Sequence, residues 1–446
     1  MLGVNTTMNL LEFGRNKVYW LLDALRGGEV KEYLKVIEEC NSGIKNDDQI
    51  IEYQKTCISN LLDYCRTNVS YYKNMSDSDI ENWPVISKAI IKDNRKEFIS
   101  KICNENQLIK MSTSGSTGTP FVSLQDVGKK RHVNAETMYY MGLLGYKVGQ
   151  RIIFLRSLVE ECEKSKFQQF SQNIYQINCN DLSDEGIRQK IKKIEKLSKK
   201  SGAFLIAYSS TYDAFRKYFD KNGYEETKNC KIHGIVAGSE MLYDITRESM
   251  EKAFRCQCVS RYANEENGFL GQDFIENNVF LIDRADYYVE VLQFDSDQRA
   301  EDGETGRIVV TDLYNYGLPM VRYDTGDVGA LTHVEINGKK RLAIGSFGGR
   351  AVDVIYDSHG KQLSPHAITN AMWRFQSLKQ FKFIQTGQIT YEIHLNIGNE
   401  RIDENILKED LRNVLGDNSV ISIFYVDEIP VLASGKRRYI ENQWNH

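Results

Sequence analysis

From Leu108 to about Tyr323, short β-rich segments alternate with helical patterns. RIIFLRS, AFLIAYSS and KIHGIVAG are rich in β-branched and aromatic residues, and the helical patterns DEGIRQKIKKIEKLSKK and TYDAFRKYFDKN lie among them. Such alternation is typical of an α/β domain in which helices pack on a sheet. The sequence therefore predicts an α/β fold for this part of the chain.

Residues 1–105 are predicted to form a mainly helical lead-in. KVYWLLDAL and VKEYLKVIEE carry apolar residues at the three-to-four spacing of helices packed on a core. An amphipathic membrane anchor is the alternative, but the polar faces mix both charges, so we expect core packing. In the helical pattern that contains the lysine-rich residues 190–200, the lysines are expected to face outward. Its predicted buried stripe is Ile187, Ile191, Ile194 and Leu197.

After Tyr287 the sequence is dominated by strand patterns, and after Arg350 its character changes again. Two strand patterns in LKQFKFIQTGQITYEIHLNI, a helical pattern in DENILKEDLRNVLG and a strand pattern in SVISIFYVD predict a compact α+β unit. No low-complexity linker separates this unit from the rest. We therefore expect a large N-terminal domain, 1–349, joined by a short hinge to a small mobile C-terminal domain, 350–446.

Composition excludes several functions. A formal net charge of −4 gives no basic surface for nucleic acid, and no apolar run reaches membrane-spanning length. With no signal peptide recognised, a cytoplasmic location is expected; the oligomeric state, including a homodimer, is left open.

Among nine cysteines, only Cys256 and Cys258 are close together, in an apparent strand that would direct both to one face. Reduced thiols are favoured there over a zinc site.

The segment MSTSGSTGTPF is rich in hydroxyl groups and glycine. It lacks the lysine of a phosphate-binding loop that leads into a helix. Pro120, which has no N–H, is followed by strand-like residues, so a strand-to-strand connection is expected. Its hydroxyl groups, and the backbone N–H groups that the glycines leave accessible, could bind a polyanion. A surface loop without a ligand is an equal alternative. The candidate residues are Thr113, Ser114, Gly115, Ser116, Thr117, Gly118 and Thr119.

Further segments follow in a fixed order: RYANEENG, then GETGRIVVTDLYNYGLPMVRYDTGDVG, then IPVLASGKRR. With the hydroxyl-rich segment, they resemble the signatures of the adenylate-forming superfamily of acyl-CoA synthetases. WPVISKAIIKDN and the PMVRYDTGD phrase resemble its phenylacetate–CoA ligase and CapK-like branch in particular. The resemblance extends from about Pro84 to the C-terminus. It implies a large adenylate-forming domain with packed sheets and helices, plus a small C-terminal domain.

The resemblance also implies a reaction and a set of site residues. A carboxylic acid and ATP would give an acyl-adenylate, with Mg²⁺, before transfer to coenzyme A or another nucleophile. Residues 113–119 would hold the phosphates and Glu266 would bind Mg²⁺, a cation that prefers oxygen ligands. Asp327 would bind the ribose, with Arg350 nearby. Gly238, Ser239 and Glu240 would border the adenine and Tyr262 would stack on its ring, and Arg261 is a further nucleotide-binding candidate.

The same resemblance assigns the catalytic cation to Lys436, near the C-terminus. Attack of a carboxylate on the α-phosphate brings two anions together, and the Lys436 ammonium would stabilise them when the small domain closes. Asp353 falls at the position of the hinge. The alternative is a solvated lysine in a basic tail, since Arg437 and Arg438 follow directly.

Two residues depart from the family pattern, and simpler roles remain for others. Ala263 replaces the family's glycine, and Glu265 replaces its serine or threonine. The Glu265 carboxylate, which comes directly before Glu266, would add a metal ligand, turn outward or weaken ATP chemistry. The alternative function is therefore a catalytically impaired nucleotide-binding protein that acts as a scaffold. Asp312, Asp324 and Asp327 could cap turns, Tyr262 could be core, and Glu266 could form a surface ion pair. The acid and the acceptor are not identified, and surface-polysaccharide or specialised metabolism is an expected context.

Overall fold

The computed structural model describes residues 6–113, 121–156, 163–179, 181–350, 355–360, 362–363, 368, 371–372, 375, 378–397, 402–427, 429 and 440–444. Its helices include α1 (Leu10–Leu25), α2 (Glu29–Asn41), α3 (Asp47–Asn68), α4 (Lys88–Asp93), α5 (Arg95–Phe98), α6 (Val127–Leu143), α7 (Lys166–Gln172), α8 (Asp184–Ser198), α9 (Ser209–Asn222), α10 (Asp244–Phe254) and α12 (Glu404–Leu415). Its strands include β1 (Ile109–Thr113), β2 (Phe121–Gln125), β3 (Ile152–Arg156), β4 (Ile174–Asn178), β5 (Ala203–Tyr208), β6 (Ile232–Gly238), β7 (Cys258–Asn264), β8 (Gly268–Glu276), β9 (Val279–Ile282), β10 (Tyr287–Leu292), β11 (Thr305–Asp312), β12 (Tyr323–Ile336), β13 (Lys339–Arg350), β14 (Ile355–Tyr356), β15 (Gln362–Leu363), β16 (Leu378–Gln385), β17 (Thr390–Ile397), β18 (Val420–Tyr425) and β19 (Ile440–Asn442).

The chain forms two compact units. Unit 1 contains the described residues of Met1–Glu290, Val309–Tyr323 and Thr332–Gly345. Unit 2 contains those of Val291–Ile308, Asp324–Leu331 and Ser346–His446. The domain boundary between residues 349 and 350 stays a prediction.

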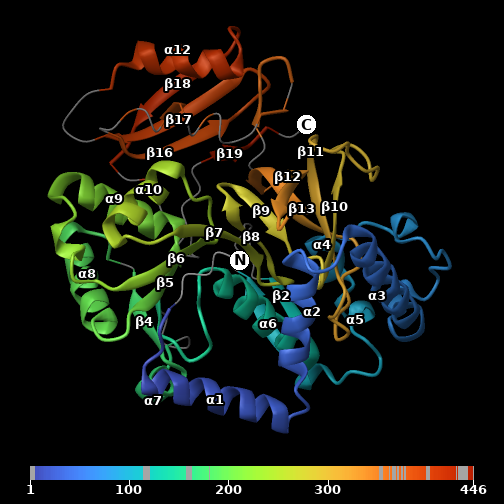
Figure 1. Cartoon of the computed structure of the whole chain (residues 1–446). Helices are drawn as coiled ribbons and strands as arrows, with labels where there is room; N and C mark the ends of the chain where they lie inside the picture. The colour runs from blue at the N-terminus through green and yellow to red at the C-terminus, as the bar shows by residue number, and fades with distance from the viewer. Residues whose placement is uncertain are drawn as a thin grey trace. The chain divides into compact units, whose positions relative to one another are not determined.

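The largest sheet has the strand order β10-β11-β12-β13-β9-β8-β7-β6-β5-β3-β4 (Figure 1). The strands β4, β3, β5, β6 and β7 are parallel neighbours, whereas β7, β8, β9 and β13 pair antiparallel. Parallel neighbours need a crossover connection, and α8, α9 and α10 supply it after β4, β5 and β6. The predicted α/β fold is therefore confirmed.

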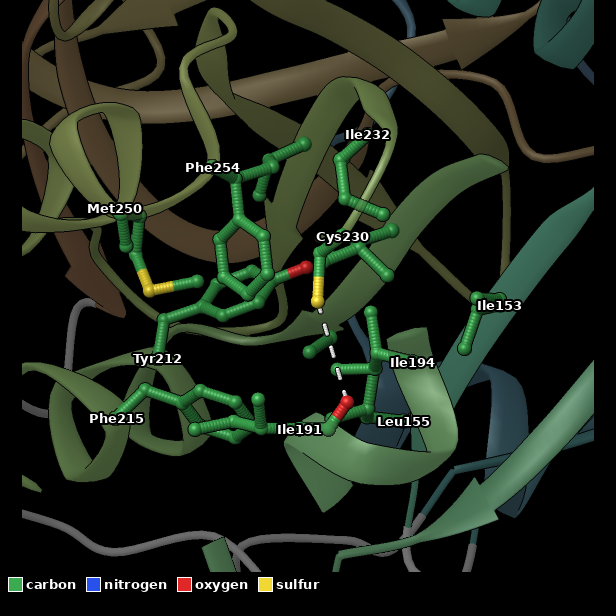
Figure 2. Close-up of a cluster of buried hydrophobic side chains, with 14 of the residues drawn as sticks. Ile153, Leu155, Ile191, Ile194, Tyr212, Phe215, Cys230, Ile232, Met250 and Phe254 are labelled. Atoms are coloured by element: carbon green, nitrogen blue, oxygen red, sulfur yellow. Dashed lines mark hydrogen bonds between the residues drawn. The ribbon is translucent and has the colours of Figure 1, made fainter. Parts of the chain in front are cut away.

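The main core of unit 1 lies between these parallel strands and their helices. Figure 2 shows β3, α8, α9 and α10 contributing apolar side chains to one cluster, in which the Cys230 thiol lies 4.0 Å from the Ile191 carbonyl oxygen. Burial of one such side chain contributes about 1.5–3 kcal/mol to the free energy of folding. The cluster therefore fixes the strand ends that carry the candidate site. Its members include Ile153, Leu155, Ile191, Ile194, Tyr212, Phe215, Met250 and Phe254.

The lysine-rich helix α8 confirms the predicted buried stripe, with one difference. Ile187, Ile191 and Ile194 are buried and Leu197 is partly buried. Lys190, however, does not face outward: its residue is 5% exposed and its Nζ donates to the carbonyl oxygens of Asp181 and Gly186. Its long aliphatic stem covers apolar surface while the ammonium group reaches main-chain acceptors.

Helices α1 and α2 occur where the sequence predicts them, but the expectation of core packing is wrong for α1. Its buried residues are Glu12 and Asp23, whereas seven large apolar side chains are 44–86% exposed. Glu12 Oε1 accepts a hydrogen bond from Ser201 Oγ at 2.8 Å. Asp23 accepts from the backbone N–H groups of Val30 (3.2 Å) and Lys31 (3.1 Å) at the start of α2. Polar contacts, not apolar burial, thus attach α1. Across the described ranges, no helix is long and apolar enough to cross a membrane.

The C-terminal part of unit 2 carries the predicted strands and helix. A four-stranded sheet has the order β18-β17-β16-β19, in which β16 and β17 pair antiparallel. Helix α12 begins after Asp403, whose carboxylate accepts from the N–H of Asn405 at 2.9 Å. Its leucines pack with inward side chains of the sheet, as the alternating pattern of β17 predicts. This core includes Phe383, Tyr391, Ile393, Leu395, Leu407, Leu411 and Leu415.

Candidate nucleotide site

The hydroxyl-rich segment connects two antiparallel strands, as the sequence predicts. Strands β1 and β2 pair with Thr113 opposite Phe121. Residues 114–120 therefore join two strands and do not lead into a helix. Ser114, Gly115, Ser116, Thr117, Gly118 and Thr119 lie outside the described residues, and their phosphate-binding role stays a prediction.

Three predicted site residues lie where β6 ends. Gly238 is the last residue of β6, and Ser239 follows with a φ of 69°. The Glu240 carboxylate accepts from the backbone N–H of Ser210 at 2.8 Å, in the first turn of α9. Ser209 Oγ donates to the Glu240 carbonyl oxygen, also at 2.8 Å. The positive end of the helix dipole favours a carboxylate there, so α9 fixes this turn.

Arg261 and Tyr262 come from the neighbouring strand β7. A Cβ at Gly238 would lie 3.3 Å from Arg261 Nε, so glycine lets the guanidinium approach the end of β6. Arg261 also lies over the Phe269 ring, and burial lowers its pKa. Tyr262 is 5% exposed and packs edge-on against Phe280, with centroids 6.2 Å apart. The structure thus gathers the predicted adenine-side residues at the carboxyl ends of two parallel strands, where ligands of open α/β sheets bind.

Glu266 is held by two side chains from distant parts of unit 1. Its residue is 2% exposed, its Oε1 lies 2.5 Å from Lys88 Nζ, and the Tyr323 hydroxyl donates to the same oxygen at 3.3 Å. Gln125 Nε2 donates to the carbonyl oxygens of Glu265 and Glu266, both at 3.4 Å. Glu265 is exposed, and its negative charge acts to raise the pKa of Arg261 against the larger effect of burial.

Lys88 is a site residue that sequence reasoning missed. It begins α4, and Ile86 just before it forms a parallel bridge with Tyr323. The Ile86 N–H donates to the Arg322 carbonyl oxygen at 2.9 Å, which fixes this segment beside the start of β12. The available signal was the lysine directly after WPVIS, a phrase that contributed only to the family resemblance.

A buried ionic network supports the segment that follows Glu266. Lys129 Nζ lies 3.3 Å from Glu136 Oε1 and 3.1 Å from Asp312 Oδ2, and all three side chains are fully buried. The Tyr287 hydroxyl lies 2.8 Å from both Lys129 Nζ and the Asn267 carbonyl oxygen. Burial opposes the charge of Lys129, but Asp312 and then Glu136 outweigh it and raise its pKa.

The same network fixes the backbone on both sides. The Phe269 N–H donates to Glu136 Oε2 at 2.8 Å, next to Gly268 with a φ of +127°. A Cβ at Gly268 would lie 2.7 Å from Glu136 Oε2, so only glycine fits. Asp312 also accepts from the Tyr314 N–H at 3.1 Å, which is the turn-capping role weighed for it. The spacing of Lys129, His132 and Glu136 on one helical face was the signal for this network.

Asp283 and Asp286 interact with this network and have pKa values shifted in opposite directions. Burial, and then the Asp286 carboxylate, raise the pKa of Asp283 to about 8. Burial opposes ionisation of Asp286, but His132 Nδ1, 3.0 Å from its Oδ1, and Lys129 outweigh it and lower its pKa. An unfolded aspartate has a pKa of about 3.9, so between about pH 4 and 8 the folded state keeps a proton that the unfolded state releases. Stability from this group is therefore lost as pH rises through that window.

We expect Asp283→Asn to reduce this loss. Because asparagine is isosteric and does not titrate, the variant should gain at least about 1 kcal/mol relative to the parent between pH 5 and pH 8. Urea unfolding at several pH values measures the change. The control is Asp184→Asn, whose side chain is 60% exposed on α8. Parallel stability profiles for the parent and the Asp283 variant would contradict the assignment.

Asp327 lies in unit 2, at a turn within β12. Gly326 has a φ of +74° and its N–H donates to Asp324 Oδ1 at 2.9 Å, while the Asp327 N–H donates to Thr325 Oγ1 at 3.1 Å. Asp324 also pairs with Arg307 at 2.8 Å. These contacts hold Asp327 in position within its own unit. Arg350 ends β13, its side chain is not among those described, and Asp353 and Lys436 lie outside the described residues.

A further expectation concerns the cysteines Cys256 and Cys258. Cys256 precedes β7, which begins at Cys258. The expectation that both thiols lie on one face of a strand is therefore wrong. Burial raises the pKa of Cys256 to about 12, and within the described ranges no group of three His, Cys, Asp or Glu side chains could hold a metal ion. On α6, Tyr139 and Tyr140 are buried. Tyr140 stacks on Phe269 with centroids 4.4 Å apart.

Comparisons with known proteins agree with the fold. Residues 355–443 match the family model described as the CapK C-terminal domain. Protein CapK of Staphylococcus aureus is 25% identical over 434 residues, with 92% of each chain covered. The structure of 2-hydroxyisobutyryl-CoA ligase in the postadenylation state with R3-HIB-AMP is similar with a TM-score of 0.68 and 12% identity, over 87% of this chain and 89% of the ligase. ATP-bound MatB from Rhodopseudomonas palustris has a TM-score of 0.53 and 14% identity, over 76% of this chain and 68% of MatB.

The chain has the fold of adenylate-forming CoA ligases, as the ordered motifs predicted. The chain is similar to CapK proteins, both in the C-terminal part that the family model matches and along nearly its whole length.

Proposed function

We propose that the chain is an ATP-dependent, AMP-forming ligase that activates a carboxylic acid as an acyl-adenylate and transfers the acyl group to a nucleophile. The observation that carries the proposal is similarity over 87% of the chain to a ligase described with an acyl-adenylate. The gathering of Gly238, Ser239, Glu240 and Arg261 at the ends of β6 and β7 supports it. A thiol, coenzyme A by default, is the proposed acceptor.

The binding roles follow from the chemistry of each residue. Residues 113–119 hold the β- and γ-phosphates through hydroxyls and N–H groups. Gly238 to Glu240 border the adenine, Tyr262 stacks on its ring, and Arg261 is a further nucleotide-binding residue. Asp327 binds the ribose, with Arg350 nearby. Mg²⁺ commonly takes one or two protein carboxylates and completes its shell with phosphate oxygens and water, so Glu266 alone is a sufficient protein ligand. When bound, the ion neutralises phosphate charge.

In the proposed reaction the acid's carboxylate oxygen attacks the α-phosphorus, the bond to the bridging oxygen of pyrophosphate breaks, and pyrophosphate leaves. Lys436 stabilises the charge that develops between the two anions. Movement about Asp353 then withdraws Lys436, and the acceptor attacks the acyl carbon while AMP leaves. A cytoplasmic location, a homodimer and a role in surface-polysaccharide metabolism remain predictions.

Exchange of labelled pyrophosphate into ATP, dependent on an added carboxylic acid, tests the proposal. A panel of aliphatic, aromatic, hydroxy and sugar-derived acids should contain at least one that supports exchange, since reversal of adenylation returns pyrophosphate to ATP. Calorimetry with ATP and Mg²⁺ measures nucleotide binding alongside. Binding of ATP without exchange for any acid would favour the alternative, a nucleotide-binding protein that lacks catalysis.

Lys88 should position Glu266 within this site. Lys88→Met leaves the buried Glu266 carboxylate with the Tyr323 hydroxyl as its remaining described partner, so we expect a roughly ten-fold rise in the KM for Mg·ATP. Pyrophosphate exchange at varied ATP and Mg²⁺ measures the effect. Lys92→Met, an exposed position on the same helix α4, is the matched control. Equal KM values for the two variants would remove Lys88 from the site.

A further inference from the structure

Helix α1 carries an apolar face with no cover among the described residues. Leu10, Leu11, Val18, Leu21, Leu22 and Leu25 are 44–86% exposed. At 3.6 residues per turn, these six positions, here called the α1 apolar face, fall within an arc of about 120°. Single exposed leucines are ordinary, but six along one face of a 16-residue helix mark an interaction surface.

The short helix α7 contacts α1 and carries exposed phenylalanines. Arg15 Nη2 donates to the Phe170 carbonyl oxygen at 2.9 Å, and its guanidinium lies 5.1 Å from the centroid of the Phe170 ring. Figure 1 shows α7 beside one end of α1. Phe167 and Phe170 on α7 are 77% and 55% exposed. The exposed Phe170 ring therefore lies beside Arg15 of α1.

The exposed charges of α1 have a single sign. Its two acids, Glu12 and Asp23, are 1% and 9% exposed and accept the hydrogen bonds that attach the helix. Lys17 is exposed, Arg15 is partly exposed, and Arg26 is exposed at the C-cap. On the helical projection Lys17 lies on one side of the α1 apolar face, and Arg15 and Arg26 lie on the other. Glu12 and Asp23 give the sequence of α1 its mixed charge, but both are buried and do not contribute to its exposed surface.

We propose that the α1 apolar face binds the surface of an anionic lipid membrane, an inference independent of the proposed enzymatic function. An apolar stripe flanked by Lys and Arg suits a helix lying in the plane of the membrane interface, with leucines among acyl chains and cations near headgroup phosphates. At about 24 Å in length, α1 lies on the bilayer and does not span it. A charge pattern of one sign favours the lipid surface over a second copy of the chain, whose own basic residues would repel it.

Vesicle flotation of the full chain tests this proposal. The parent should float with vesicles of equimolar phosphatidylcholine and phosphatidylglycerol, and much less with phosphatidylcholine alone. Leu21→Gln/Leu25→Gln, which keeps helix propensity, should lower the partition coefficient at least about ten-fold. Lys17→Gln/Arg26→Gln should lower it about ten-fold on the anionic vesicles alone, and added salt should mimic that loss.

The control variant is Ile102→Gln, an apolar position that is 71% exposed elsewhere in unit 1. It should float within about two-fold of the parent, because one scattered apolar residue makes no membrane surface. Light scattering without vesicles measures oligomeric state in parallel. Failure of the parent to float would overturn the proposal, as would flotation equal in all variants. The proposal would also be overturned if the parent formed a dimer that the leucine substitutions dissociate, while the vesicle binding of the leucine variant equalled that of the parent.

Discussion

Lys436→Ala should bind ATP like the parent but lose most of its adenylation. A fixed positive charge at developing anionic oxygens typically contributes 10²–10³-fold to rate, so we expect pyrophosphate exchange to fall by roughly that factor. ATP affinity should change little, because in the proposed reaction this ammonium acts when the small domain closes. Exchange kinetics and calorimetry measure the two properties separately.

The matched control for this prediction is Arg438→Ala, two positions further along the same basic segment. If Lys436 were one solvated cation of a basic tail, both variants would behave alike. Adenylation by Lys436→Ala within a few-fold of the parent would remove it from the catalytic role. A parallel loss of ATP binding would instead indicate a purely electrostatic contribution to nucleotide capture.

Lys129→Met should cause the largest loss of stability. Removal of this ammonium leaves the Glu136 and Asp312 carboxylates buried and uncompensated, which costs about 3–5 kcal/mol. The loss should shrink at low pH, because the carboxylates can then take up protons. Activity should fall as well, since the network holds the backbone from Asn267 to Phe269 beside Glu266.

Lys130→Met is the control, because the same substitution then falls on a partly exposed lysine of the same helix. Its free energy of unfolding should stay within about 0.5 kcal/mol of the parent. Urea unfolding at pH 5 and 7 compares the three proteins. A loss in Lys129→Met no larger than in the control would show that the ionic network does not stabilise unit 1.

Sequence reasoning predicted what local pattern encodes. The alternation around β3 to β7 gave the fold class, and Pro120 with the residues after it gave the strand-to-strand connection, because both depend on neighbours in the chain. Helix α1 shows the limit: its periodicity predicts an apolar face but not what covers that face. Burial of its acids depends on distant partners such as Ser201.

The candidate site shows the same division. Motif order pointed to Glu266, but the pairing with Lys88 joins segments far apart in the chain, and no local pattern reports such a contact. Lys190 was expected to be exposed because lysine side chains usually are. In the folded state, however, nearby carbonyl oxygens accept hydrogen bonds from its ammonium group. Asp312 combined a turn cap, which sequence suggested, with an ion pair, which only the fold creates.

A crystal structure with Mg²⁺ and a non-hydrolysable ATP analogue tests the central claim most directly. We predict β- and γ-phosphates within hydrogen-bond distance of residues 113–119, the adenine beside Tyr262 and Arg261, and the metal ion on Glu266. A triphosphate bound elsewhere on the molecule, with the 113–119 segment making no contact to it, would contradict the assignment of this chain as an adenylate-forming ligase.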